Sequence, residues 1–61
     1  MNDELRRRVR LLKALQGVSY KEIASYLEIT VNSLYNWLRN QYDLSEGKQK
    51  DLAEILDNLT D

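Results

Sequence analysis

The sequence predicts an all-α protein, a compact bundle of four or five short helices that contains a helix-turn-helix. Apolar residues make up 43% of the 61 residues and recur at helical spacing, and the chain contains no proline. Two short amphipathic segments lie between residues 19 and 38 with a break of only three residues. A chain of this length makes one small domain, so we expect residues 1–61 to form a single helix-turn-helix domain.

The first predicted helix runs from about residue 2 to Gln16. Asn2 or Asp3 can cap its first turn, and Gly17 can end it because glycine readily adopts the left-handed conformation that follows a helix. Its apolar positions step by four and three residues, and Leu11 widens the stripe that they form: Leu5, Val9, Leu12 and Leu15. We expect this stripe to pack against the helices that follow.

A capping box of the form S-x-x-E marks the start of the second helix. The Ser19 hydroxyl accepts the Glu22 amide, and the Glu22 carboxylate reaches back to the Ser19 amide, so the helix begins at Tyr20. One narrow apolar stripe follows, made of Ile23, Ala24 and Leu27. Ala24 is small enough to let two helices cross at close range.

The third predicted helix runs from Val31 to about Asn40. Thr30 can cap its start, and Ile29 can fill the gap between this helix and its predecessor. Its inward face carries apolar residues at i, i+3 and i+4, namely Leu34, Trp37 and Leu38. Together these features fit a helix-turn-helix frame with no insertion.

This frame resembles the lambda-repressor and Cro type of phage helix-turn-helix regulator. The resemblance covers Tyr20 to Arg39, and its framework residues are Ala24, Ile29, Leu34 and Leu38. Glu28 stands where that family usually has a glycine in the turn. A left-handed backbone there would cost a non-glycine residue roughly 1 kcal/mol. The resemblance also implies that the first helix lies mostly behind the DNA-facing surface.

A last helix is predicted from about Glu46 to Leu59. Ser45 can cap it, and Leu44 just before the cap can act as a hydrophobic staple. Four apolar residues follow at helical spacing: Leu52, Ile55, Leu56 and Leu59. Part of this stripe must close the core, and we expect the rest to form a homodimer contact made by Leu52, Leu56 and Leu59. The alternative is that the whole stripe belongs to the core.

Composition excludes several classes of function. The chain has no cysteine and no histidine, which excludes disulfides, zinc fingers and imidazole catalysis. Its carboxylates are scattered over helix ends, so we expect no enzyme activity, no catalytic or metal-binding residues, no cofactor and no small-molecule ligand. Apolar runs are short and the first residues lack an apolar segment, so we expect no membrane span, no signal peptide and a cytoplasmic protein.

The net charge of −1 conceals a basic middle. Residues 5–50 hold all nine basic side chains and only four acidic ones, a local charge of +5, while the other acids lie at the two ends. Attraction to phosphates depends on the field within about a Debye length, ~8 to 10 Å, so this local charge matters more than the sum. The distribution favours a nucleic-acid partner.

The outward face of the third helix would then read bases in the major groove. Asparagine can bond to both the N6 and N7 atoms of adenine, serine can donate or accept, and valine methyls can contact thymine. The resemblance places the family's usual base-contacting positions on Val31, Asn32 and Asn36. The predicted base-contacting residues are Val31, Asn32, Ser33, Tyr35 and Asn36.

Phosphate contacts are expected on both sides of that helix. The start of the second helix offers free amides and a positive dipole end, and amide, hydroxyl and basic side chains follow the third helix. The predicted phosphate-contacting residues are Ser19, Tyr20, Lys21, Arg39, Asn40, Gln41, Tyr42 and Lys48.

Four arginines on the first helix form the densest basic cluster, at positions 6, 7, 8 and 10. On a solvated face they would pair with Asp3, Glu4 or the acidic C-terminal segment. The alternative is that one or two of them contact phosphates.

We therefore expect a sequence-specific regulator of transcription of the phage or mobile-element repressor type. It would bind double-stranded DNA as a homodimer and insert the third helix into the major groove. The alternative is a small helical protein-binding module with an antirepressor, antitoxin-like or nuclease-inhibitor role, because a fold does not fix a function.

Overall fold

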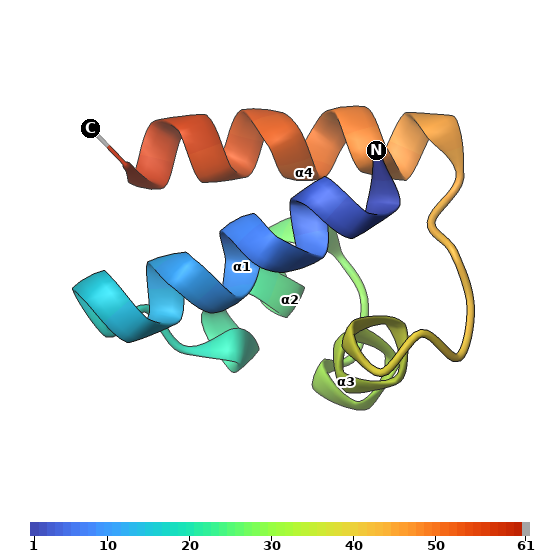
Figure 1. The fold of residues 1–61 in the computed structure, drawn as a ribbon, viewed down its shortest axis with the longest axis horizontal. Helices are drawn as coiled ribbons and strands as arrows, with labels where there is room; N and C mark the ends of the chain where they lie inside the picture. The colour runs from blue at the N-terminus through green and yellow to red at the C-terminus, as the bar shows by residue number, and fades with distance from the viewer. Residues whose placement is uncertain (61) are drawn as a thin grey trace.

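A computed structural model describes residues 1–60, and these residues form four helices and no strand (Figure 1). The helices are α1 (Asn2–Gln16), α2 (Tyr20–Leu27), α3 (Val31–Leu38) and α4 (Glu46–Leu59). Helix α4 lies along α1, while α2 packs against both α3 and α4. The predicted all-α bundle with a helix-turn-helix is confirmed, and it has four helices. No helix among the described residues is both long enough and apolar enough to cross a membrane.

The core gathers apolar side chains from all four helices, and Trp37 is its largest fully buried member. Its buried members are Leu5, Val9, Leu12, Ile23, Ala24, Leu27, Leu34, Trp37, Leu38, Leu44, Leu52 and Leu56. Every inward residue predicted for the helix-turn-helix is therefore buried, except Ile29, which is half-buried and packs against the same core. This packing, more than helix propensity, stabilises helices as short as α2 and α3.

Three helices begin as the sequence predicts. The hydroxyls of Ser19, Thr30 and Ser45 each accept the amide three residues later, which satisfies one free amide in each first turn. Within residues 1–60 the Glu22 carboxylate makes no return bond to the Ser19 amide, so only half of the predicted capping box forms.

The start of α1 differs from the prediction. Its cap position is Met1, and no side chain caps the helix. The Asn2 side-chain oxygen, Oδ1, instead accepts two hydrogen bonds of 2.9 Å, from Trp37 Nε1 and from the Leu44 amide. Asn2 therefore ties the start of α1 to α3 and to the segment that leads into α4.

The apolar stripe of α1 is also narrower than predicted. Leu5, Val9 and Leu12 are buried, whereas Leu11 and Leu15 are 54% and 74% exposed. The buried residues of α1 lie in its first three turns, whereas Leu11 in the third turn and Leu15 in the last turn face solvent. Gly17 ends the helix in the predicted left-handed conformation, with a φ of 69°.

Helix α3 ends at Leu38, two residues earlier than predicted. Asn40 has a φ of 63°, and the amides of Asn40 and Gln41 donate to the carbonyls of Trp37 and Asn36. These two bonds form a Schellman motif, which stops a helix at a left-handed residue. An asparagine adopts this conformation more easily than most residues do.

The predicted dimer contact on α4 needs correction. Leu52 and Leu56 are 0% and 1% exposed and close the core over α1 and α2, so they offer no surface to a second copy. Leu59 is half-buried, and with Tyr26, Ile55 and Asn58 it lines a surface hollow of about 240 Å³. Of the three predicted contact residues, only Leu59 reaches the surface.

Candidate nucleic-acid interface

The face of α3 that points away from the core carries the predicted base-contacting residues. Asn32 and Tyr35 are exposed, and Val31, Ser33 and Asn36 are half-buried. The division follows from the burial of Leu34, Trp37 and Leu38, which turns the other side of the helix toward solvent. An amide-rich, solvent-facing helix of this kind can present hydrogen-bond donors and acceptors to base edges.

The turn between α2 and α3 sets the angle of this face. The Glu28 backbone is left-handed, with a φ of 62°, and the Ile29 amide donates to the Ala24 carbonyl at 3.0 Å. Ala24 is buried at this point, so the two helices approach without a large side chain between them. The turn that the sequence predicts thus forms with glutamate in place of glycine.

Tyr20 brings a predicted phosphate contact beside a predicted base contact. Its ring meets the Tyr35 ring edge to face, with centroids 5.7 Å apart, and Lys13 Nζ lies 4.9 Å from the centre of the Tyr20 ring. Both tyrosines line a surface hollow of about 260 Å³ together with Arg10, Leu38 and Arg39. The C-terminal half of α1 therefore borders this surface.

Several cations near α3 have no carboxylate partner within residues 1–60. The ion pairs in this part of the chain involve only Arg6 and Arg8. Arg39 and Lys21 are exposed, and Arg39 donates to the Asn36 side-chain oxygen at 3.2 Å. This bond orients a predicted base contact and leaves a positive charge next to it.

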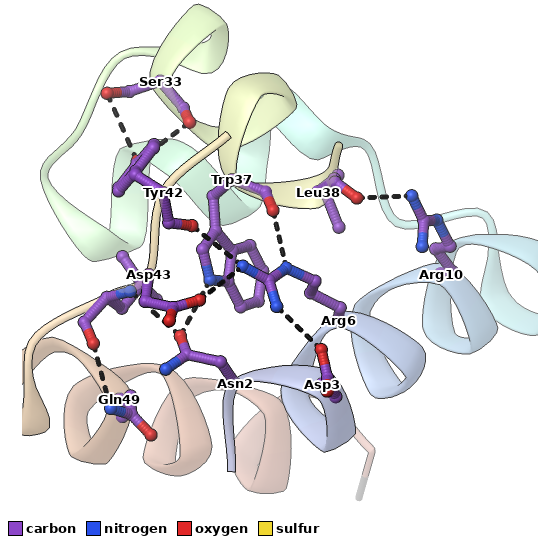
Figure 2. A network of polar contacts seen from close by, with 11 residues as sticks. Asn2, Asp3, Arg6, Arg10, Ser33, Trp37, Leu38, Tyr42, Asp43 and Gln49 are labelled. Carbon is purple, nitrogen blue, oxygen red and sulfur yellow. Dashed lines mark hydrogen bonds and ion pairs between the residues drawn. The ribbon is translucent and has the colours of Figure 1, made fainter. Parts of the chain in front are cut away.

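Arg6 is buried, contrary to the solvated face predicted for the arginine cluster. Its side chain donates four hydrogen bonds within 3 Å, and the guanidinium carbon lies 5.1 Å from the centre of the Trp37 ring (Figure 2). Its position three residues before Val9, at the edge of the apolar stripe, is the signal in the sequence that could have revealed it.

Two other arginines of the cluster have different partners. Arg8 pairs with Asp57 at 2.6 Å, as expected for a solvated face beside the acidic last helix. Arg10 donates to the Leu38 carbonyl at 2.7 Å and thus caps the end of α3.

Tyr42 and Lys48 are placed differently from the other predicted phosphate contacts. The Tyr42 hydroxyl donates to the Ser33 carbonyl at 2.9 Å, so its proton is already used within the chain. Lys48 Nζ donates to the Leu27 carbonyl, and Lys48 lines a hollow with three acidic residues, Glu28, Asp51 and Glu54. Those carboxylates disfavour a phosphate at Lys48. Ser19, Lys21, Arg39, Asn40 and Gln41 remain exposed.

The fold and this polar face define a helix-turn-helix domain of the DNA-binding type. Residues 3–40 match the family model described as Sigma-70, region 4. The match covers more than half of the chain, including α1 from its second residue and all of α2 and α3, so the chain belongs to this family of helix-turn-helix DNA-binding domains. No curated protein and no solved structure shows a significant match.

The family assignment refines the resemblance found in the sequence. The helix-turn-helix regulator class is confirmed, whereas the matched family is sigma-70 region 4, not the lambda-repressor and Cro type. The matched segment ends at residue 40, so α4 lies outside it. Among residues 1–60 no group of three or more acidic residues is placed to hold a metal ion.

Proposed function

We propose that this protein is a sequence-specific regulator of transcription that inserts α3 into the major groove of double-stranded DNA. The observation that supports it is the outward face of α3, where amide and hydroxyl groups lie beside Arg39, a cation that forms no ion pair within residues 1–60. Such a helix can supply base contacts from its first turns and phosphate contacts from its flanks.

The base contacts of this proposal are Val31, Asn32, Ser33, Tyr35 and Asn36. The phosphate contacts come from the start of α2 and from the segment after α3, and they are Ser19, Tyr20, Lys21, Arg39, Asn40 and Gln41. Free amides at the start of α2 and the positive end of its dipole add to the attraction.

The proposed biological role is that of a repressor of the phage or mobile-element type, which binds a symmetric site as a homodimer. Half-sites read by two copies would lie about one helical turn apart, ~34 Å. A small domain also gains stability from a second copy. The surface proposed for the dimer contact is the hollow beside Leu59. The substitution Leu59→Glu should then abolish any increase of molecular mass with protein concentration, while the helical circular dichroism signal stays unchanged.

Selection of binding sites from random duplexes, followed by a salt titration on the selected duplex, tests the proposal. We expect a recurrent sequence and a log–log slope that corresponds to roughly 6 to 10 neutralised phosphates per dimer. Replacing Asn32 and Asn36 by alanine should weaken sequence preference by about 1 to 3 kcal/mol per lost contact and leave the unfolding midpoint nearly unchanged. Absence of binding at low salt would contradict the proposal.

A protein-binding role is the second candidate. The observation that favours it is the hollow between α2 and α4, where Tyr26 and Ile55 lie beside the carboxylates of Glu28, Asp51 and Glu54. A basic partner would suit this surface. Retention of sequence-specific DNA binding after Glu54→Lys would show that DNA recognition does not use it.

A further inference from the structure

The buried Arg6 guanidinium joins two segments that are distant in the sequence. Its Nε donates to the Trp37 carbonyl at 2.6 Å, and its Nη2 donates to the Tyr42 carbonyl at 2.8 Å and to the Asp43 carboxylate at 2.9 Å. Its Nη1 donates to Asp3 on its own helix at 2.9 Å. One planar group therefore fixes both the last turn of α3 and the segment that follows it (Figure 2).

The segment after α3 folds back along the helix as a result. The Schellman motif at Asn40 reverses the chain, and Arg6 then holds Tyr42 and Asp43. From this position the Tyr42 side chain reaches the first turns of α3, where its hydroxyl donates to the Ser33 carbonyl at 2.9 Å and lies 3.4 Å from the Ser33 hydroxyl oxygen. Trp37 and Ser33, one turn apart, are thus both held by side-chain hydrogen bonds.

In this arrangement the Tyr42 hydroxyl can act toward a ligand only as a hydrogen-bond acceptor. Its only proton points at the Ser33 carbonyl, so its remaining capacity is to accept. Phosphate oxygens are acceptors and need a donor, whereas the exocyclic amino groups of adenine and cytosine are donors in the major groove. Tyr42 is 38% exposed beside the first turns of α3, so such a donor can approach it.

We propose that Tyr42 determines sequence specificity by accepting a hydrogen bond from an adenine N6 or cytosine N4 amino group, and that Arg6 is the residue that positions it. This inference rests on the proposed function, because it adds a reading group to the same DNA-facing surface. Arg6 itself is 5% exposed and touches no DNA. A lysine could not replace it, because an ammonium group lacks the planar fork that reaches two carbonyls and two carboxylates.

The test compares sites selected from random duplexes by the wild-type protein and by Tyr42→Phe, which removes only the hydroxyl. At one base pair per half-site we expect preference for adenine or cytosine to fall about three- to tenfold, the value of one hydrogen bond. The log–log salt slope should stay unchanged. The matched control is Tyr26→Phe, because Tyr26 is exposed on α2 and its hydroxyl makes no hydrogen bond within residues 1–60.

Asp43→Ala tests the positioning role of Arg6 and leaves the buried guanidinium in place. It removes one of the four acceptors around Arg6, and its own side chain is 74% exposed. We expect a smaller loss of preference at the same base pair and no further loss when Asp43→Ala is combined with Tyr42→Phe, because both changes act through one contact. Arg6→Lys should behave as Asp43→Ala does where it remains folded by circular dichroism.

The outcomes separate the two proposals. Wild-type protein that selects no sequence contradicts the proposed function itself. Wild-type protein that selects a site which Tyr42→Phe selects equally well overturns the role of Tyr42. A salt slope lowered by about one unit in Tyr42→Phe would assign this hydroxyl to a phosphate and would also overturn it. Additive losses in the double variant would overturn the positioning role of the Arg6 network.

Discussion

The two connections that flank α3 reverse the chain by the same backbone device but are held by different forces. Each contains a left-handed residue that is not glycine, Glu28 before the helix and Asn40 after it, with φ values of 62° and 63°. Apolar contacts around Ala24 and Ile29 hold the first connection. Hydrogen bonds that the Arg6 side chain donates and that the Asn2 side chain accepts hold the second.

Helix α3 is therefore positioned by packing on one side and by polar geometry on the other. Packing tolerates small shifts, because neighbouring side chains can adjust. A buried guanidinium has a fixed set of donor directions, so loss of the group leaves its acceptors without partners. Substitutions at the two connections should therefore change the free energy of unfolding by different amounts and for different physical reasons.

The largest effect is expected at the polar connection. Arg6→Ala should lower the free energy of unfolding by about 3 kcal/mol, because hydrogen bonds to charged groups are worth more than neutral ones and the Trp37 carbonyl loses its side-chain partner. Urea denaturation followed by circular dichroism measures it. The matched control is Arg7→Ala, an exposed neighbour expected to change stability by less than about 0.5 kcal/mol. Equal effects of the two substitutions would contradict the structural role of Arg6.

A smaller loss is expected at the apolar connection. Ala24→Leu should destabilise the protein by about 1 to 3 kcal/mol, since the larger side chain forces α2 and α3 apart. The same urea titration reports it, with Ala14→Leu on the exposed face of α1 as the control. If both leucine variants were as stable as the wild type, close contact at Ala24 would not be needed.

The smallest effects are expected from glycine at the two left-handed positions. Glu28→Gly should raise the free energy of unfolding by up to about 1 kcal/mol, because it removes the strain of a side chain in that conformation. Asn40→Gly should change it less, since asparagine adopts the left-handed region more readily. Thermal unfolding measures the gain in stability of each variant, and a larger gain for Asn40→Gly than for Glu28→Gly would contradict this order.

Much of the first connection could be predicted from the sequence, because its signals are local. Caps at Ser19 and Thr30 and the inward stripe around Ala24 each depend on residues within one or two turns. The second connection could not, because Arg6 meets Trp37 and Tyr42 across 31 and 36 positions of the chain. No short-range spacing carries that information.

The same distinction between local and long-range signals explains why some residues of the predicted interface lie as the sequence predicts and others do not. The exposed and inward faces of α3 follow from helical periodicity, so the residues assigned to each face are largely as predicted. The surroundings of Lys48 depend on where α4 packs against the helix-turn-helix. The hydrogen bond that occupies the Tyr42 hydroxyl proton depends on how the segment after α3 folds back along that helix. The sequence predicts a dimer contact at Leu52 and Leu56 because it does not show how much core one helix must close.

The helix outside the family match, α4, is part of the core on which α3 depends. Helix α4 supplies Leu52 and Leu56 to the core, while the proposed reading face lies on α3. Loss of α4 from the core would leave the residues proposed to contact DNA in place and still uncover the apolar faces of α1 and α2 to water. The helices that support α3 therefore depend on a segment that the family match does not include.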